Sequence, residues 1–141
     1  MNRTERDRFD ALLEGVIDSL PRRIRELLDE APLIVDDQPS PQLLKELGID
    51  PSEENPLCGL HSGTPLTDRS VSQGDELPET IHLFRDGVLD EAGGWERWQD
   101  DEGEWWGGEE QVREEIRITL LHEIGHHFGL DENDLTELGY D

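Results

Sequence analysis

The sequence predicts a single α+β domain of 141 residues, in which helices near both ends flank a few short strands. Three observations support this fold class. Apolar residues recur at helical spacing before residue 30 and again after residue 109, short β-branched runs lie between them, and segments rich in proline, glycine, serine and aspartate separate these runs. The length allows one core without disulfide bonds, so we expect one domain over residues 1–141.

The first 50 residues should be mainly helical. Residues 33–35 form a short apolar, β-branched run between Pro32 and two aspartates, which predicts a strand. Residues 41–47 predict a brief helix that Gly48 ends. Pro21 divides two earlier helical patterns, whose apolar positions are Phe9, Leu12, Leu13, Val16, Ile17 and Leu20 before it and Ile24, Leu27 and Leu28 after it.

Loops and two short strands are expected in the middle of the chain. Loop-forming residues dominate positions 50–56 and 61–78, so a short apolar strand is expected at residues 57–60 between them. Residues 80–84 predict a second strand, because their side chains alternate between two faces. One face carries Ile81 and Leu83, and the other carries Thr80, His82 and Phe84.

A long amphipathic helix is expected from Glu109 to Gly129. Acidic residues occupy its first turn, where the helix dipole favours them, and Gly129 is a natural C-terminal stop. Residues 131–138 predict a last short helix. The apolar side of the long helix carries Val112, Ile116, Leu120 and Ile124.

All the tryptophans lie within residues 90–108, among glycines and acids, where no helix or strand period is evident. We favour an ordinary hairpin in which the indoles form cross-strand pairs. The alternative is a flap over a cleft, or an aromatic landing site for a peptide or a partner. The four residues are Trp95, Trp98, Trp105 and Trp106.

Charge and cysteine content restrict the partners and the compartment. Twelve basic residues against 36 acidic ones give a net charge of −24, which repels phosphate backbones and anionic membranes. No nucleic acid and no membrane partner is therefore expected. Cys58 is the single cysteine and lies in an apolar run, and the N-terminus lacks an apolar signal segment. These features predict a cytoplasmic protein in which Cys58 is a strand residue and not a nucleophile.

The chemistry is carried by His122-Glu123-Ile124-Gly125-His126, an H-E-x-x-H pattern within the long helix. His126 lies about 40° round the helix from His122 and one turn along, so both imidazoles can reach one Zn²⁺ ion. Glu123 flanks that face, where it can take a proton from water as the general base. Two imidazoles and a carboxylate would also suit iron, nickel or cobalt.

A catalytic zinc site needs a third protein ligand. Gly129 permits a sharp turn that sends the chain back toward the metal, and Glu132 follows His122 by ten residues. Glu132 is our first choice for the third ligand. Asp131, one position earlier, is the second choice, and Glu137 is a further possibility.

Here the sequence resembles the small bacterial zincin-like metallopeptidases, or minimal zincins, whose extended signature is H-E-x-x-H-x-x-G-x-x-(Asp or His). The resemblance is specific over residues 122–134 and looser over residues 59–67, 81–85 and 135–140, so it covers about residues 57–141. It implies a minimal zincin-like fold with a small mixed sheet, an edge strand beside a cleft and an active-site helix behind it. It also implies a zinc peptidase.

Two positions depart from related patterns. Glu132 stands where the signature usually has aspartate or histidine. Met1 is the only methionine, so the Met-turn of the metzincins is absent and the chain is not a member of that group.

Other polar residues are candidates for supporting roles. His61, His82 or Tyr140 could donate a hydrogen bond to an oxyanion. His127 lies beyond the metal face and is more typical of a packed or solvent-facing histidine. Glu115, two turns before His122, could orient a ligand or could simply be an exposed helix acid.

The leading hypothesis is hydrolysis of a peptide or protein substrate with Glu123 as base. The alternative is a noncatalytic, zinc-stabilised protein-binding module that uses the Trp-rich segment 90–108. A closed metal site with four protein ligands would distinguish the second case. A third reading, an intracellular peptidase of regulatory proteins with a ligand from a later helix, is disfavoured by the short tail after His126.

Overall fold

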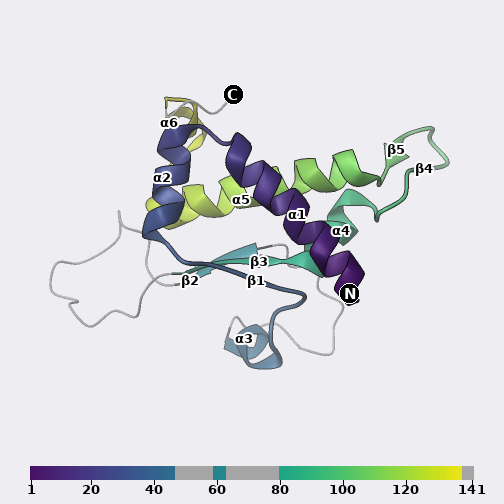
Figure 1. Ribbon diagram of the computed structural model, residues 1–141, viewed down its shortest axis with the longest axis horizontal. Helices are drawn as coiled ribbons and strands as arrows, with labels where there is room; N and C mark the ends of the chain where they lie inside the picture. Colours follow the sequence, from purple (N-terminus) through teal and green to yellow (C-terminus); the bar gives the residue numbers. More distant parts are fainter. Residues whose placement is uncertain (47–58, 63–79, 138–141) are drawn as a thin grey trace, which may run out of the picture.

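A computed structural model describes residues 1–46, 59–62 and 80–137 (Figure 1). Within these ranges the side chains of residues 46, 60–62 and 132 lie outside the description. The described part combines helices with a three-stranded sheet and a two-stranded one, which confirms the α+β class.

Two N-terminal helices form as the sequence predicts. Helix α1 (Arg3–Ser19) begins after Asn2, whose side-chain oxygen accepts a hydrogen bond of 2.8 Å from the backbone N–H of Glu5. Pro21 separates it from α2 (Arg22–Glu30), because proline cannot continue the hydrogen-bonding pattern of α1. The apolar positions that pack from α1 and α2 into the core are Phe9, Leu12, Leu13, Val16 and Ile24.

The main sheet contains β1 (Leu33–Asp36), β2 (Gly59–Ser62) and β3 (Thr80–Phe84) in the order β1-β3-β2. β1 runs parallel to β3 and β2 runs antiparallel to it, so the sheet is mixed, as expected. The short helix α3 (Pro41–Glu46) follows β1.

The predicted bounds of β2 were wrong. The strand continues through His61 and Ser62, which were assigned to a loop, and Leu57 and Cys58 lie outside the described residues. Ser62 pairs with Thr80, so the ladder runs to the start of β3. Local composition favoured a loop there, whereas pairing with a neighbouring strand extends the element.

The sheet lies between two helical layers (Figure 1). The long helix α5 (Glu109–Phe128) packs against β2, β3 and α1 on one face, whereas α3 lies on the opposite face. Ile81 and Leu83 of β3 are fully buried in the core beneath α5. One hydrophobic cluster connects residues from Phe9 to Leu135.

Helix α4 (Arg85–Ala92) was not anticipated, and its last residues contradict the expectation that no helix lies within residues 90–108. The helix is too short for a clear apolar period, but Val88 and Ala92 are fully buried, and α4 packs on α5. Gly93 ends it in the left-handed conformation, with φ of 98°. Tertiary burial therefore decides this element.

The Trp-rich segment forms a hairpin of β4 (Trp98–Gln99) and β5 (Trp105–Trp106). Trp98 pairs directly with Trp106, which confirms the favoured cross-strand interpretation for these two indoles, whereas Trp105 pairs with Gln99 and Trp95 precedes β4. The hairpin projects beyond the N-terminal end of α5 (Figure 1).

Helix α5 ends at Gly129, which adopts φ of 68°, and the short helix α6 (Glu132–Glu137) follows, both as predicted. The predicted apolar positions on α5 are fully buried: Val112, Ile116, Leu120 and Ile124. Among the described residues, no helix combines the length and the apolar character needed to cross a membrane.

Candidate metal and catalytic site

Three side chains near the C-terminal end of α5 form the candidate site. His122, Glu123 and His126 each offer a ligand atom, and these atoms all lie within 4.8 Å of one another. The two imidazole rings have centroids 4.1 Å apart and are tilted by 58°. The four-residue separation on a helix brings the two rings to one face, as the sequence indicated.

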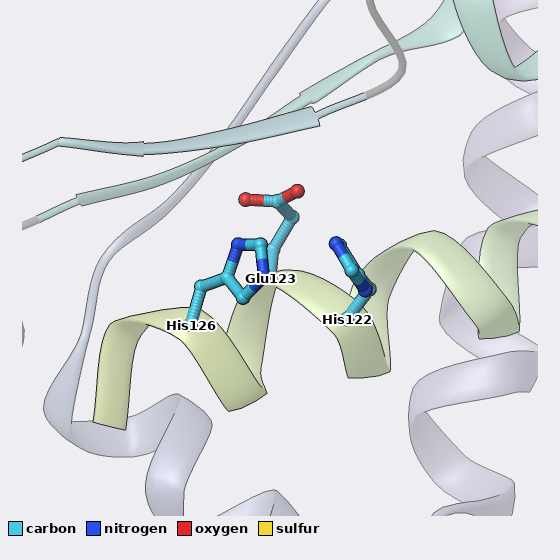
Figure 2. A group of neighbouring side chains, drawn as sticks. All are labelled: His122, Glu123 and His126. Carbon is cyan, nitrogen blue, oxygen red and sulfur yellow. The ribbon is translucent and has the colours of Figure 1, made fainter. Parts of the chain in front are cut away.

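Burial separates the acid from the two histidines. His122 and His126 are exposed, whereas the side chain of Glu123 is buried, with a residual exposure of 7%. Figure 2 shows that all three side chains project from the same side of α5, where the strands of the sheet pass, and that the carboxylate of Glu123 points toward these strands. The imidazoles are therefore accessible while the carboxylate is held under the sheet.

Gly59 explains how a helix carrying Glu123 can lie so close to β2. A methyl group at Gly59 would stand 2.9 Å from Cγ of Glu123, 3.0 Å from Cγ2 of Thr119 and 3.1 Å from the backbone oxygen of His82. Only glycine fits this contact without displacing its neighbours. The sequence resemblance included Gly59, but the reason for a glycine at this position became visible only in the tertiary contact.

The chain turns back after the site. Gly125 is still within α5, and Gly129 caps the helix. The carbonyl of Gly125 accepts a 2.7 Å hydrogen bond from the N–H of Leu130, which follows the cap. A methyl group on Gly125 would lie 3.1 Å from the carbonyl oxygen of Leu130. This tight reversal leads directly into α6 and its acids, as the glycine at position 129 predicted.

The three candidates for a further ligand are placed differently. Glu132 is the first residue of α6, and its side chain lies outside the description. Asp131 caps α6: its Oδ1 accepts a 2.8 Å hydrogen bond from the N–H of Asp134, and its own N–H donates to Oδ2 of Asp134 at 3.0 Å. Neither Asp131 nor Glu137 belongs to the group formed by the two histidines and Glu123.

His82 does not face the site, so its suggested role as an oxyanion donor is wrong. Leu83, its neighbour on β3, faces the core beneath α5, and alternation turns His82 to the opposite face of the sheet. There it stacks on Phe84, with ring centroids 6.0 Å apart, and its Nε2 is 3.0 Å from the hydroxyl of Thr80. Burial lowers the pKa of His82, although the charge of Asp36 opposes the effect.

Within the described part of the chain, none of the other candidates for a supporting role joins the group of His122, Glu123 and His126. The side chain of His61 and all of Tyr140 lie outside the description. His127 is buried against the edge of Phe128, with ring centroids 4.7 Å apart, which agrees with a packed histidine. Burial raises the pKa of Glu115, and the negative charges of Glu91 and Glu114 add to this.

The donor set fits a divalent transition metal. Two exposed imidazoles and a carboxylate, whose ligand atoms lie within 4.8 Å of one another, supply nitrogen and oxygen donors of the kind that zinc takes in catalytic sites. His122 and His126 would hold the ion, and a further ligand must come from elsewhere in the chain. Among the residues that the structure describes, this group contributes two histidines and one glutamate, a set that fits a catalytic zinc site once a further ligand is added.

Comparison with known families agrees with this chemistry. A sequence model described as zincin-like metallopeptidase matches residues 28–140, which is most of the chain. The protein therefore belongs to the zincin-like metallopeptidase family. No curated protein matches the sequence.

Proposed function

We propose that this protein hydrolyses peptide bonds with a zinc ion held by His122, His126 and Glu132. The observation that carries the proposal is the convergence of His122, Glu123 and His126, whose ligand atoms lie within 4.8 Å of one another on one helix of a zincin-like metallopeptidase. Bound zinc would supply Lewis acidity, which polarises the scissile carbonyl and makes water more acidic.

Glu123 acts as the general base. Its carboxylate takes one proton from the attacking water, whose oxygen bonds to the carbonyl carbon. The carbon–nitrogen bond then breaks, and Glu123 returns the proton to the leaving amine. The side chain of Glu123 is buried and lies close to Gly59, where a methyl group would stand 2.9 Å from its Cγ, and this close packing limits where the carboxylate can move before the substrate arrives.

The substrate would bind as an extended segment beside β2. In the described sheet β2 is an edge strand, next to β3 alone, and an edge strand can pair with a peptide through main-chain hydrogen bonds. Because α5 packs against β2, a peptide on that edge would lie near the side chains of the site. A peptide or a protein with an accessible extended segment is the expected substrate class.

The decisive experiment compares the parent with Glu123→Gln. Zinc content is measured by mass spectrometry, and cleavage is measured with casein and a peptide library. Glu123→Gln should retain zinc and lose about 10²- to 10⁴-fold in kcat/KM, because the ligands remain while the base is removed. Glu110→Gln, a 90% exposed glutamate of the same helix, is the matched control and should behave as the parent does.

The outcomes separate the competing functions. Equal cleavage by parent and Glu123→Gln would overturn the role of the glutamate. If both proteins bind zinc and neither cleaves, a noncatalytic zinc-stabilised binding module is favoured, in which the exposed tryptophans contact a partner. Absence of zinc from the parent after loading would overturn the metallopeptidase proposal as a whole.

A further inference from the structure

The β4–β5 hairpin exposes aromatic surface that the proposed peptidase chemistry does not use. Trp98, Trp105 and Trp106 have exposed fractions of 47%, 57% and 38%, although indole is among the largest apolar side chains. The hairpin lies at the opposite end of α5 from the histidines, with about 20 Å of helix between Glu109 and His122 (Figure 1). This position disagrees with a flap over the site.

The hairpin is held in a fixed conformation. The carboxylate of Asp100 accepts hydrogen bonds of 2.9 Å from the N–H groups of Glu102 and Glu104, and of 2.8 Å from Nε1 of Trp106. Nε1 of Trp98 donates to the carbonyl of Gly93 at 2.7 Å. These bonds orient the two indoles before any partner binds, which reduces the ordering cost of binding.

The two faces of the hairpin differ. Trp98 and Trp106 are directly paired, so both project from one face, where they stack with centroids 6.2 Å apart. Trp105 projects from the other face, where the guanidinium of Arg97 covers its ring at 4.8 Å. One face therefore has its own cation, whereas within the described part of the chain the cations that lie over indoles, Arg97 and Arg8, cover Trp105 and Trp95 and not the paired face of Trp98 and Trp106.

The charge around the tryptophans selects the partner. Between residues 96 and 110 there are seven carboxylates and one cation, Arg97. The acids are Glu96, Asp100, Asp101, Glu102, Glu104, Glu109 and Glu110. A second copy of this chain, also at −24, would be repelled, whereas a cationic segment would be attracted.

We infer that the face formed by Trp98 and Trp106 is a docking surface for an arginine- and lysine-rich polypeptide segment of a partner protein. The cationic side chains lie over the indoles, and the surrounding carboxylates neutralise the remaining charges. The chain already uses this contact internally, because Arg97 lies over Trp105 and Arg8 lies over Trp95, at 4.4 Å from the ring centroid.

The first test measures binding of a fluorescein-labelled peptide of alternating arginine and glycine by fluorescence anisotropy at physiological ionic strength. Trp98→Ala/Trp106→Ala should weaken binding roughly 5- to 30-fold, because two cation–π contacts are lost while the net charge is unchanged. Ile118→Ala is the control: it removes an exposed apolar side chain on α5, outside the hairpin, and this variant should bind the peptide as the parent does. Equal affinity of the double variant and the parent would overturn the inference, since general charge attraction would then explain the binding.

A second test uses the parent alone, so that it does not depend on the stability of a variant. Indole N–H resonances are followed by ¹⁵N NMR during titration with the same peptide. The signals of Trp98 and Trp106 should shift, whereas that of Trp95, which donates to Glu5 and packs beneath Arg8, should stay in place. Equal shifts of all indoles, or shifts that follow protein concentration without peptide and so indicate a second copy, would overturn the assignment.

Discussion

The two ends of helix α5 differ in which side chains they bury and which they expose. At the C-terminal end, polar groups converge: His122, Glu123 and His126 share one face, and the carboxylate is buried under β2. At the N-terminal end, the hairpin exposes aromatic side chains to solvent, and Trp98 and Trp105 are about half exposed. A buried acid beside exposed imidazoles is typical of a catalytic site, whereas exposed indoles among carboxylates are typical of a surface that binds a partner.

Glycine has a different role at each end. Gly59 supplies space, because helix α5 approaches β2 too closely for any side chain. Gly107 supplies a backbone conformation, with φ of 73°, that connects the hairpin to α4 and α5. Its N–H donates to the carbonyl of Ala92 at 2.8 Å, so the hairpin is fixed to the end of α4. Variants at these two positions should therefore disturb one end and leave the other intact.

The largest expected effect comes from removing an imidazole at the site end. His122→Ala should lower zinc affinity by more than about 100-fold, which exceeds the loss typical of an outer-sphere partner, because a direct ligand is removed. Affinity is measured by competition with a chromophoric chelator. His82→Ala, on the other face of the sheet, is the control and should retain parental affinity. Unchanged affinity in His122→Ala would mean that the metal is held elsewhere.

Gly59→Ala tests whether β2 positions the base. The new methyl group would stand 2.9 Å from Cγ of Glu123, so the carboxylate must move, and kcat should fall by up to about 100-fold with zinc content unchanged. Gly15→Ala is the control, because nothing lies within 4 Å of the new atom on α1. That control should raise the free energy of unfolding by about 0.5–1 kcal/mol and leave kcat unaltered. A fall in zinc content instead of kcat would assign Gly59 to the metal site itself.

Gly107→Ala should break the hairpin end selectively. A methyl group there would overlap the carbonyl oxygen of Glu96 and stand 3.0 Å from that of Gly93, at a φ that favours glycine. The free energy of unfolding should fall by roughly 1–3 kcal/mol, and the binding of the arginine peptide should weaken. Chemical denaturation followed by tryptophan fluorescence measures the first quantity. Loss of zinc in this variant would show that the two ends of α5 are coupled.

The smallest effect is a pH dependence at the hairpin. The hydrogen bond from Trp106, together with those from the Glu104 and Glu102 backbone, lowers the pKa of Asp100 below its usual 3.8. A lowered pKa in the folded state means that the carboxylate favours the folded hairpin above about pH 3.8 and that this contribution is lost as the pH falls through the lowered pKa. Tryptophan fluorescence should therefore titrate in acid. Asp100→Asn should remove that transition, and a parental titration in the variant would point to a different acid.

Periodic local patterns could be predicted well from the sequence. Helix α5 has an apolar residue at every fourth position from Val112 to Ile124 and a glycine stop, so its bounds and its buried positions followed directly. The same regularity placed His122 and His126 on one face, since helical geometry alone fixes their angle. The strand β3 was also found, because its alternation is complete over its five residues.

Elements that depend on partners could not be predicted in the same way. Helix α4 has eight residues and is stabilised by burial of Val88 and Ala92, which no local period reveals. The end of β2 at Ser62 is set by pairing with Thr80. His82 was a reasonable candidate for the site by residue type, but the pairing register and the position of α5 turn it to the other face.

By itself, the sequence determined the H-E-x-x-H helix, the family and the chemistry that two imidazoles and a glutamate can perform, because these follow from residue types at fixed helical spacing. Only the tertiary structure decided that Glu123 is buried beneath Gly59 and that Trp98 and Trp106 form one exposed face. Whether a side chain is buried, and which face of an element it occupies in the fold, depends on how elements pack against one another, and residues distant along the chain determine that packing.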